Sequence, residues 1–242
     1  MNRQRLRKAL ILVSFLLFPV TVFYFSPLLI LVGASMGIIT GSFITFAALF
    51  VTSLFFGRAW CGWACPTGGL QEHCFSINDN RTKEKYYNVK YFIWVPWISL
   101  IAILAILAGG YTKIDPLFFT NNGISISEPF LYSIYFAVLL IPLIPAIWGG
   151  KRAACHYLCW MAPFMIIGTK IKNTARWPSL HLMANKELCL ECKICSKNCP
   201  MSLEVNEKVK KEDMKDYECI LCGTCVDSCP QGTIKYHFGN QK

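Results

Sequence analysis

The chain has 242 residues, of which 54% are hydrophobic and only 16% are charged. Because an average soluble domain is about 25% charged, this composition argues against an ordinary soluble enzyme and against a disordered chain. The formal net charge is +10. We attribute it to basic segments that flank membrane helices and face anionic lipid, and we expect no nucleic-acid partner.

Segments without charged side chains or histidine predict the membrane helices. The first runs from Ala9 to Gly57, 49 residues in all. A helix needs about 20 apolar residues to cross a bilayer, so this segment suits a helical hairpin. Two more, Tyr91–Thr112 and Pro129–Gly150, have 22 residues each. The sequence therefore predicts a mostly α membrane protein with four transmembrane helices in two tandem hairpins, at about 9–28, 35–57, 91–111 and 129–149.

The first predicted span has two unusual features. Pro19 and Pro27 would bend it. The basic start of the chain resembles the first part of a signal peptide, but the apolar segment behind it is too long for one. We therefore expect a retained first helix.

Lysine and arginine are unevenly distributed between the predicted loops. Four precede the first span, five lie in 57–90, one lies in 112–128 and fourteen follow residue 149. By the positive-inside rule, both termini and the loop 57–90 face the cytoplasm. This predicts a multi-pass protein of the cell inner membrane, with every cysteine motif on the cytoplasmic side.

The end of the chain carries the strongest motif. Two runs with the spacing C-x2-C-x2-C-x3-C-P begin at Cys189 and Cys219. This spacing places three thiolates around one iron–sulfur cube, and the fourth cysteine of each run reaches the other cube. We expect two 4Fe–4S clusters, one held by Cys189, Cys192, Cys195 and Cys229, the other by Cys219, Cys222, Cys225 and Cys199.

Two alternatives exist for these eight cysteines. Zinc sites would use two CxxC pairs and leave the other cysteines of each run idle, and disulfides are disfavoured on a reducing cytoplasmic face. The segment resembles the bacterial two-cluster ferredoxins over about 45 residues. The predicted domains are a membrane domain at 1–172, a linker at 173–183 and a small α+β two-cluster ferredoxin domain at 184–242.

A second pair of motifs follows the second and fourth predicted spans. Cys61-x3-Cys65 and Cys155-x3-Cys159 lie 94 residues apart, and each follows two spans. Tandem repeats related by an axis along the membrane normal would bring both motifs to one mouth, with each pair on one helix face. The four thiols could hold a third iron–sulfur cluster or a structural metal. They could also be redox-active dithiols or packed, reduced cysteines. Cys74 has no partner by spacing.

With these motifs the chain resembles the NapH/MauN-type membrane ferredoxins. The segment GRAWCGWACPTG at residues 57–68 is similar to the first motif of that family. The second motif differs, because Trp160 stands where the family usually has proline. The resemblance implies electron transfer linked to the quinone pool.

We therefore expect a membrane-anchored iron–sulfur protein that relays electrons between the quinone pool and a redox partner protein on the cytoplasmic side. The alternative is a maturation factor that reduces a metal or a thiol for another enzyme. The sequence has no CxxCH, GxGxxG or P-loop motif, so it predicts no covalent haem, dinucleotide or ATP site. We assign no catalytic residue and expect a component of an oxidoreductase system rather than a complete enzyme.

Overall fold

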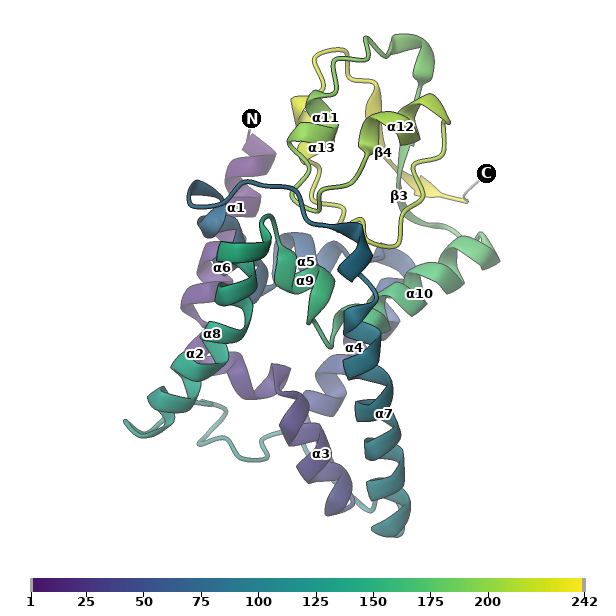
Figure 1. The fold of residues 1–242 in the computed structure, drawn as a ribbon. Coiled ribbons are helices and arrows are strands. Elements are labelled where there is room, and N and C mark those ends of the chain that lie inside the picture. Colours follow the sequence, from purple (N-terminus) through teal and green to yellow (C-terminus); the bar gives the residue numbers. More distant parts are fainter. Residues whose placement is uncertain (1, 241–242) are drawn as a thin grey trace.

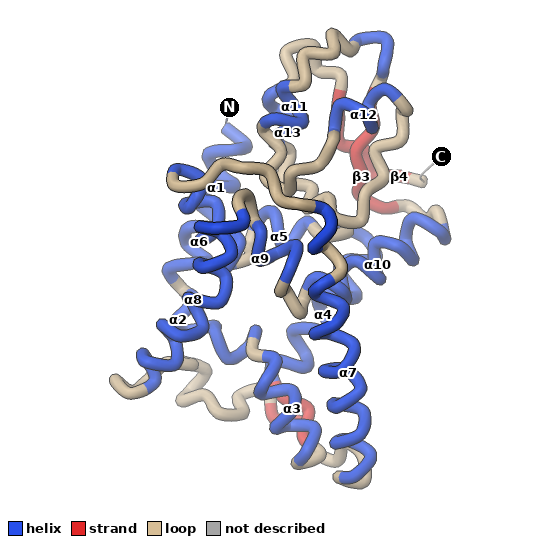
Figure 2. The backbone as a smooth tube through the Cα atoms, in the orientation of Figure 1, coloured by secondary structure: helices blue, strands red, loops and turns tan. Residues whose placement is uncertain are grey.

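The computed structural model describes residues 2–240 and is mainly helical (Figures 1 and 2). Met1 and residues 241–242, where the predicted domains begin and end, lie outside the described residues. The first part of the chain forms, in order, α1 (Asn2–Leu16), α2 (Phe18–Thr21), η1 (Val22–Phe25), α3 (Pro27–Ser35), β1 (Ile38–Thr40), α4 (Gly41–Phe56), α5 (Ala59–Trp63), α6 (Pro66–His73), η2 (Cys74–Ser76), η3 (Glu84–Tyr86), α7 (Val89–Leu107), β2 (Lys113–Asp115), α8 (Leu131–Gly149), α9 (Ala153–Tyr157) and α10 (Ala162–Ala175). The tail contains β3 (Ser179–Ala184), η4 (Lys186–Leu188), α11 (Ile194–Lys197), α12 (Val205–Lys210), α13 (Thr224–Ser228) and β4 (Ile234–Gly239).

The long apolar helices differ from the predicted spans in the first hairpin. Within residues 2–240, two helices are long and apolar enough to cross a membrane, at Glu84–Leu107 and Leu131–Gly149. A third candidate combines α1 with α2 and η1, which bend by 59° at their junction. The second predicted span, 35–57, corresponds in part to α4, which has only 16 residues. By length and composition, the described residues thus hold two spans, or three with the bent pair, where the sequence predicted four.

The predicted span 9–28 is divided at two points: α1 and α2 bend by 59° at their junction, and the extended backbone of Ser26 separates η1 from α3. The hydroxyl of Ser26 accepts a hydrogen bond from the amide of Leu29 at 3.4 Å, and Pro27 opens α3. Proline at the first helical position is preorganised for a helix start but cannot continue a preceding helix. Helix α3 then packs against α7, and β1 pairs in parallel with β2.

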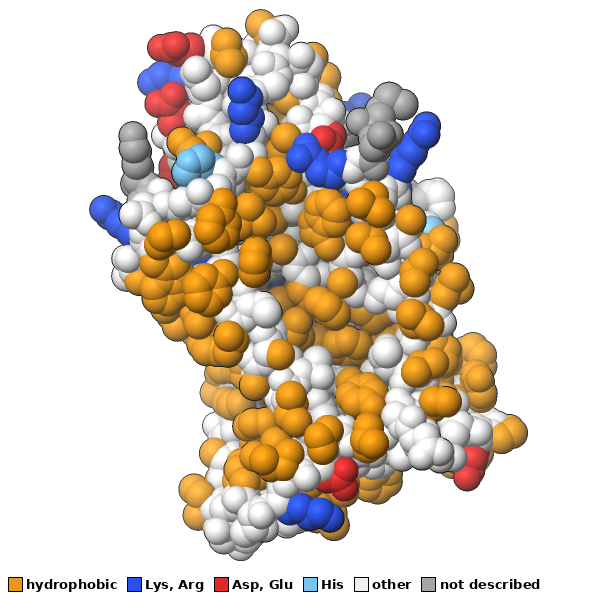
Figure 3. Space-filling view, turned by 180° about the vertical axis from the view of Figure 1, so that it is seen from behind, with side chains coloured by type: hydrophobic (Ala, Val, Ile, Leu, Met, Phe, Trp, Pro, Cys, Tyr) orange, Lys and Arg blue, Asp and Glu red, His pale blue; other side chains and the backbone are white. Residues whose placement is uncertain are grey.

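Hydrophobic side chains cover the middle of the molecule, and charged side chains gather at its ends (Figure 3). Phe92, Leu107 and Trp148 are 80%, 78% and 82% exposed. Apolar side chains exposed in such numbers fit a lipid environment rather than water. In Figure 1 the tail and the start of α1 lie at one end, and the connection between α7 and α8 lies at the other.

The tail is built on a two-stranded antiparallel sheet that includes part of the predicted linker. Strand β3 pairs with β4 so that His181 lies opposite His237. The segment 173–183, predicted as a linker, is therefore divided between the end of α10 and the start of β3. One hydrophobic core runs from the membrane helices into the tail, with Phe46 and Cys61 in the first part and Met201 and Ile220 in the second.

Candidate iron–sulfur site

The tail contains two cavities, each lined by cysteines from both runs. In each cavity three cysteines come from one run and the fourth comes from the other. The cysteines are Cys189, Cys192, Cys195 and Cys229 in the outer cavity, and Cys199, Cys219, Cys222 and Cys225 in the inner cavity.

The backbone has the same unusual conformation in both runs. Glu191 and Lys193 flank Cys192 with φ of 54° and 57°, and the corresponding residues around Cys222, Leu221 and Gly223, have φ of 48° and 75°. Non-glycine residues rarely adopt positive φ, and such strain is concentrated at functional sites. Turns that alternate between right- and left-handed conformations form concave nests of amide groups, which bind anions and many iron–sulfur clusters. The donor set and the backbone thus fit an anionic thiolate cluster in each cavity.

The two tail cavities are neighbours with different access to solvent. Cys192 is exposed, whereas Cys222 and Cys225 are buried. Burial raises the pKa of Cys225 well above its usual value, and thiols in both cavities, including Cys195, contribute to the increase. Such an influence requires the two sets of thiols to lie close together.

The structure also brings the two CxxxC motifs together. Cys61, Cys65 and Cys155 are buried, and Cys159 is partly buried. Burial raises the pKa of Cys61 to about 12; nearby Arg58 lowers it, and the thiols of Cys65 and Cys155 raise it. Burial, followed by the other three thiols of the group, raises the pKa of Cys159. We call these four residues the four-cysteine centre. Cys74 is buried and is not among the thiols that influence this centre.

Helix packing explains why the two motifs meet. Each motif begins on a five-residue helix that follows an arginine, α5 after Arg58 and α9 after Arg152. The helix after the first motif, α6, packs against α8, and the helix after the second motif, α10, packs against α4. Each motif is thereby held against the long helix that precedes the other motif. The second motif has Trp160 in place of proline, and its following helix starts later, with Pro163 in its first turn.

Two networks of buried ion pairs surround the four-cysteine centre. In the first, the Glu72 carboxylate accepts two hydrogen bonds of 2.8 Å from Arg7 and two, of 2.6 and 3.1 Å, from Arg152. In the second, Glu218 accepts a hydrogen bond of 2.6 Å from Arg58 and pairs with Lys90.

The histidine in the second motif belongs to the same environment. The Nδ1 atom of His156 lies 3.4 Å from a Glu218 oxygen, and its Nε2 atom lies 3.1 Å from the carbonyl oxygen of Met201. Burial lowers the pKa of His156, which favours a neutral ring at neutral pH. Among residues 2–240, no three His, Cys, Asp or Glu side chains form a group that could hold a single metal ion.

The four-cysteine centre lies directly against the inner tail cavity. A Cβ atom on Gly62 would overlap the carbonyl oxygen of Ile220 and would stand 3.4 Å from the Cα atom of Cys222. Beside this contact, the indole of Trp63 donates a 3.0 Å hydrogen bond to the Leu221 carbonyl. Sequence analysis assigned no role to Gly62. Its place inside the first CxxxC motif was the only signal.

An apolar cavity of about 360 Å³ between η1, α8 and the second CxxxC motif reaches the four-cysteine centre. Its lining includes Val138 from α8 and Phe25 from η1, together with Cys155 and Cys159. Gln71 is one of its few polar residues, and its side chain donates a 3.2 Å hydrogen bond to the Cys155 sulfur. The cavity therefore combines an apolar interior with access to the buried thiols.

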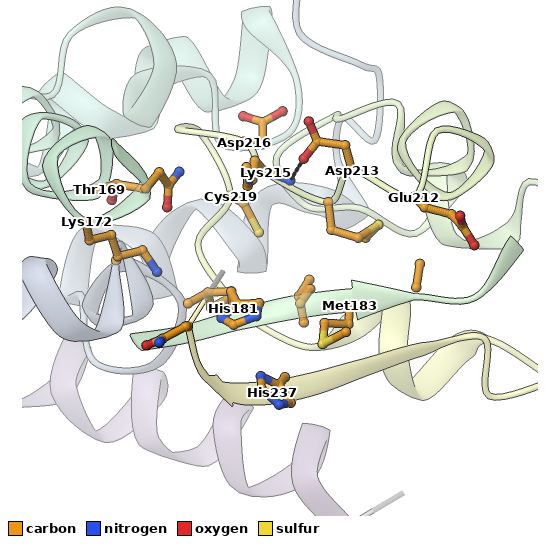
Figure 4. A pocket seen from close by; sticks show the side chains of 17 residues that line it. Thr169, Lys172, His181, Met183, Glu212, Asp213, Lys215, Asp216, Cys219 and His237 are labelled. Carbon is orange, nitrogen blue, oxygen red and sulfur yellow. Dashed lines mark hydrogen bonds between the residues drawn. The ribbon is translucent and has the colours of Figure 1, made fainter. Parts of the chain in front are cut away.

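A larger, polar cavity of about 540 Å³ lies between α10 and the tail (Figure 4). Cys219 lines it, together with Lys172, His181 and Asp216. Burial lowers the pKa of Lys172 to about 8. This cavity thus borders Cys219, one of the four cysteines of the inner tail cavity.

Comparison with known proteins supports iron–sulfur binding in two parts of the chain. A 4Fe-4S binding domain matches residues 38–83, which contain the first CxxxC motif, and a 4Fe-4S dicluster domain matches residues 188–234, which contain all eight tail cysteines. No solved structure matches the chain.

Among curated proteins, an uncharacterized protein of Methanocaldococcus jannaschii, MJ0750, is 26% identical over 79% of this chain and 77% of its own length. The putative electron transport protein YccM of Escherichia coli is 26% identical over 76% of this chain and 52% of its own length. An uncharacterized ferredoxin of M. jannaschii, MJ0199, is 40% identical over 19% of this chain and 73% of its own length. Together with the apolar helices, these matches support an iron–sulfur protein that is similar to membrane-type ferredoxins.

Proposed function

We propose that the protein relays electrons between the membrane quinone pool and a redox partner protein on the cytoplasmic side, within the NapH/MauN-type group. The observation that carries this proposal is an unbroken series of neighbouring sites. The apolar cavity borders Cys155, Gly62 packs against Cys222, and the inner tail cavity adjoins the outer one, where Cys192 is exposed. Short steps between redox centres, with one end in the membrane domain and the other at the surface, are what a relay needs.

The tail cysteines are proposed as the cluster ligands, in the two sets that line the two cavities. A bound 4Fe–4S cluster would supply one-electron chemistry. The chain supplies the thiolates and the amide nests around Cys192 and Cys222, whose positive φ values support anion binding. Burial and hydrogen bonding at each cavity would set the reduction potential.

The apolar cavity is proposed as the quinone site. Small-molecule sites are mostly apolar cavities with a few polar groups that fix orientation. The cavity of about 360 Å³ has that character, with Gln71 and Thr67 at its polar end beside Cys155. A quinone in this cavity would lie close enough to Cys155 and Cys159 to exchange electrons with the four-cysteine centre.

The proposed orientation follows from charge. The basic flanks would hold both termini, the loop 57–90 and every cysteine motif on the cytoplasmic side of the inner membrane. We keep the proposed division into a membrane domain, a linker and a ferredoxin domain, with β3 of the linker region counted in the ferredoxin domain. The partner would dock where Cys192 is exposed.

The relay is favoured over a maturation factor that works through dithiol exchange. Such exchange requires an accessible thiolate. Cys61, Cys65 and Cys155 are only 4–5% exposed, so the thiols of another protein could not reach them without a large rearrangement.

Reoxidation by quinone tests the proposal. The purified protein, reconstituted in liposomes and reduced with dithionite, would be mixed with a quinone analogue while its iron–sulfur absorption is followed. Val138→Phe fills the apolar cavity and should slow reoxidation by quinone at least tenfold, while reoxidation by soluble ferricyanide stays unchanged. Leu140→Phe, on an exposed position of the same helix, is the matched control and should behave as the wild type. Equal rates in both variants, or a wild type that quinone does not reoxidise, would contradict the proposal.

A further inference from the structure

We infer that Cys61, Cys65, Cys155 and Cys159 hold a third 4Fe–4S cluster, and that Arg58 is a positioning residue that balances its charge and raises its reduction potential. The inference rests on the proposed function, because it adds a centre to the same series of sites. It is carried by an excess of buried positive charge and by guanidinium nitrogens that lack an acceptor.

The excess charge comes from four buried cations. The side chains of Arg58, Lys90 and Arg152 are 0% exposed, and that of Arg7 is 3% exposed. Their ion pairs end on two carboxylates, Glu72 and Glu218. Four positive and two negative charges leave an excess of about two positive charges in a region that excludes water. Uncompensated buried charge is strongly destabilising.

The four-cysteine centre is where negative charge would balance this excess. Arg152 lies directly beside this centre, because its Nη1 atom donates a 2.6 Å hydrogen bond to the carbonyl oxygen of Cys61, and Arg58 precedes Cys61 by three residues. Four thiolates around an oxidised cluster core of charge +2 carry a net charge of −2. Protonated thiols or disulfides here would carry none, and a cluster in the inner tail cavity would then be the only source of negative charge besides Glu72 and Glu218.

Arg58 also lacks hydrogen-bond acceptors. Its Nη1 atom donates to Glu218 at 2.6 Å, whereas its Nε and Nη2 atoms are buried and have no partner within the described residues. Leaving a buried donor without an acceptor is destabilising, and more so when the donor is charged. Sulfide and thiolate sulfurs of a cluster would supply acceptors beside Cys61, one turn along the chain from Arg58.

A tetrathiolate zinc site would carry the same charge of −2, so geometry must distinguish the two. Zinc draws its thiolates to about 2.3 Å from one ion, and within residues 2–240 no three potential ligands form such a group. A cube offers each thiolate its own iron at a separate corner. Residues 38–83, around the first motif, also match a 4Fe-4S binding domain.

The redox step at this centre is simple. Reduction adds one electron to the cluster, changes its charge from −2 to −3, and makes or breaks no bond. A neighbouring guanidinium favours the more negative state, so Arg58 should raise the reduction potential. Removing the positive charge should lower it.

The first experiment measures iron and acid-labile sulfide in full-length protein purified without oxygen. Three cubes predict about twelve irons per chain. Cys61→Ala should lose about four irons and keep about eight, and the retained eight show that the tail is still folded. Cys74→Ala changes a buried cysteine outside the four-cysteine centre and should keep about twelve. About eight irons in the wild type, unchanged by Cys61→Ala, would overturn the inference but leave the proposed relay intact.

The second experiment measures the reduction potentials by titration with detection of the reduced clusters by electron paramagnetic resonance. Arg58→Gln should make one of the three reduction potentials more negative by at least 59 mV, which is a tenfold change in the equilibrium constant for a one-electron reduction. Arg58→Lys keeps the positive charge and should therefore bring this potential most of the way back to the wild-type value. Equal potentials in the wild type and Arg58→Gln would remove the role assigned to Arg58. If the wild type contained one zinc ion per chain and Cys61→Ala lost it, the four-cysteine centre would be a zinc site and the inference of a third cluster would be wrong. If the wild type contained no iron, the proposed function itself would be overturned.

Discussion

Gly62 illustrates how one small residue positions two redox sites. Any side chain here would overlap the Ile220 carbonyl oxygen and press on Cys222. We predict that Gly62→Ala moves the tail away from the four-cysteine centre, because overpacking of this kind typically costs about 1–3 kcal/mol. Quinone-driven reoxidation of the tail clusters should slow, with the iron content unchanged.

The control for this prediction is Ala64→Ser, a change of similar size in the same segment at a position that is only half-buried. If Gly62→Ala and Ala64→Ser both transfer electrons at the wild-type rate, the close approach at Gly62 has no functional role.

Glu72 is a second residue whose effect follows from its neighbours. Although burial raises the pKa of Glu72, Arg152 and Arg7 lower it more, so the net pKa is below the usual value. A carboxyl group with a lowered pKa stabilises the fold above its unfolded pKa of about 4.3, and this stability is lost as pH falls through the folded value. Glu72→Gln leaves two buried guanidinium groups without their carboxylate, so we predict a loss of about 3–5 kcal/mol at neutral pH.

Thermal unfolding in detergent at several pH values checks this prediction. The difference in Tm between the wild type and Glu72→Gln should be large at pH 7 and should shrink below about pH 4. Glu84→Gln, at an exposed carboxylate, should match the wild type throughout. A difference that does not depend on pH would mean that the carboxylate charge is not the stabilising feature.

At the scale of elements, the start of α1 connects the membrane domain to the tail. Gln4 donates hydrogen bonds of 3.0 Å to the Cys222 carbonyl and 2.7 Å to Asp227, and Arg3 pairs with Asp227. We predict that Gln4→Ala combined with Asp227→Asn loosens the tail. Trypsin should then cleave faster at exposed Arg176, between α10 and β3.

The matched control is Glu204→Gln, which removes a surface ion pair with Arg81 whose side chains are 53% and 43% exposed. Such pairs contribute about 0–1 kcal/mol, so cleavage at Arg176 should stay at the wild-type rate. Equal cleavage of the double variant and the control would show that α1 does not restrain the tail.

The elements also show what the sequence can predict. Spacing alone predicted the eight tail cysteines as two sets, because ligand geometry around a cube is local and regular. The break at Ser26 was only partly foreseen: Pro19 and Pro27 predicted a bend, but the path of α3 depends on its packing against α7. Strand β3 was assigned to a linker because its partner, β4, lies about 50 residues further along the chain.

The ion pairs around the four-cysteine centre could not be predicted from the sequence either, because their partners lie far apart along the chain. The repeat places Arg58 and Arg152 at equal positions before the two motifs, which marks them as a pair. Their carboxylate partners lie 160 and 80 residues away along the chain. Nothing in the local pattern connects Arg58 with Glu218 or Arg152 with Glu72. The first contact depends on the packing of the tail on the membrane domain, and the second depends on the packing of α6 beside the second motif.

For the whole molecule, the central feature is that membrane helices and tail share one hydrophobic core. A tail packed in this way is fixed against the membrane domain, so its cysteines form stationary centres rather than a mobile shuttle. The two 4Fe-4S domain matches support iron–sulfur centres in this chain, and the proposed relay depends on those centres accepting electrons.

The most direct test is a reductive titration of the anaerobic wild-type protein, which counts the electrons accepted per chain as the iron–sulfur absorption bleaches. Two tail clusters predict about two electrons per chain, and the four-cysteine centre adds about one more. Zinc has no redox chemistry. A chain that takes up no electrons and shows no bleaching would contradict the account.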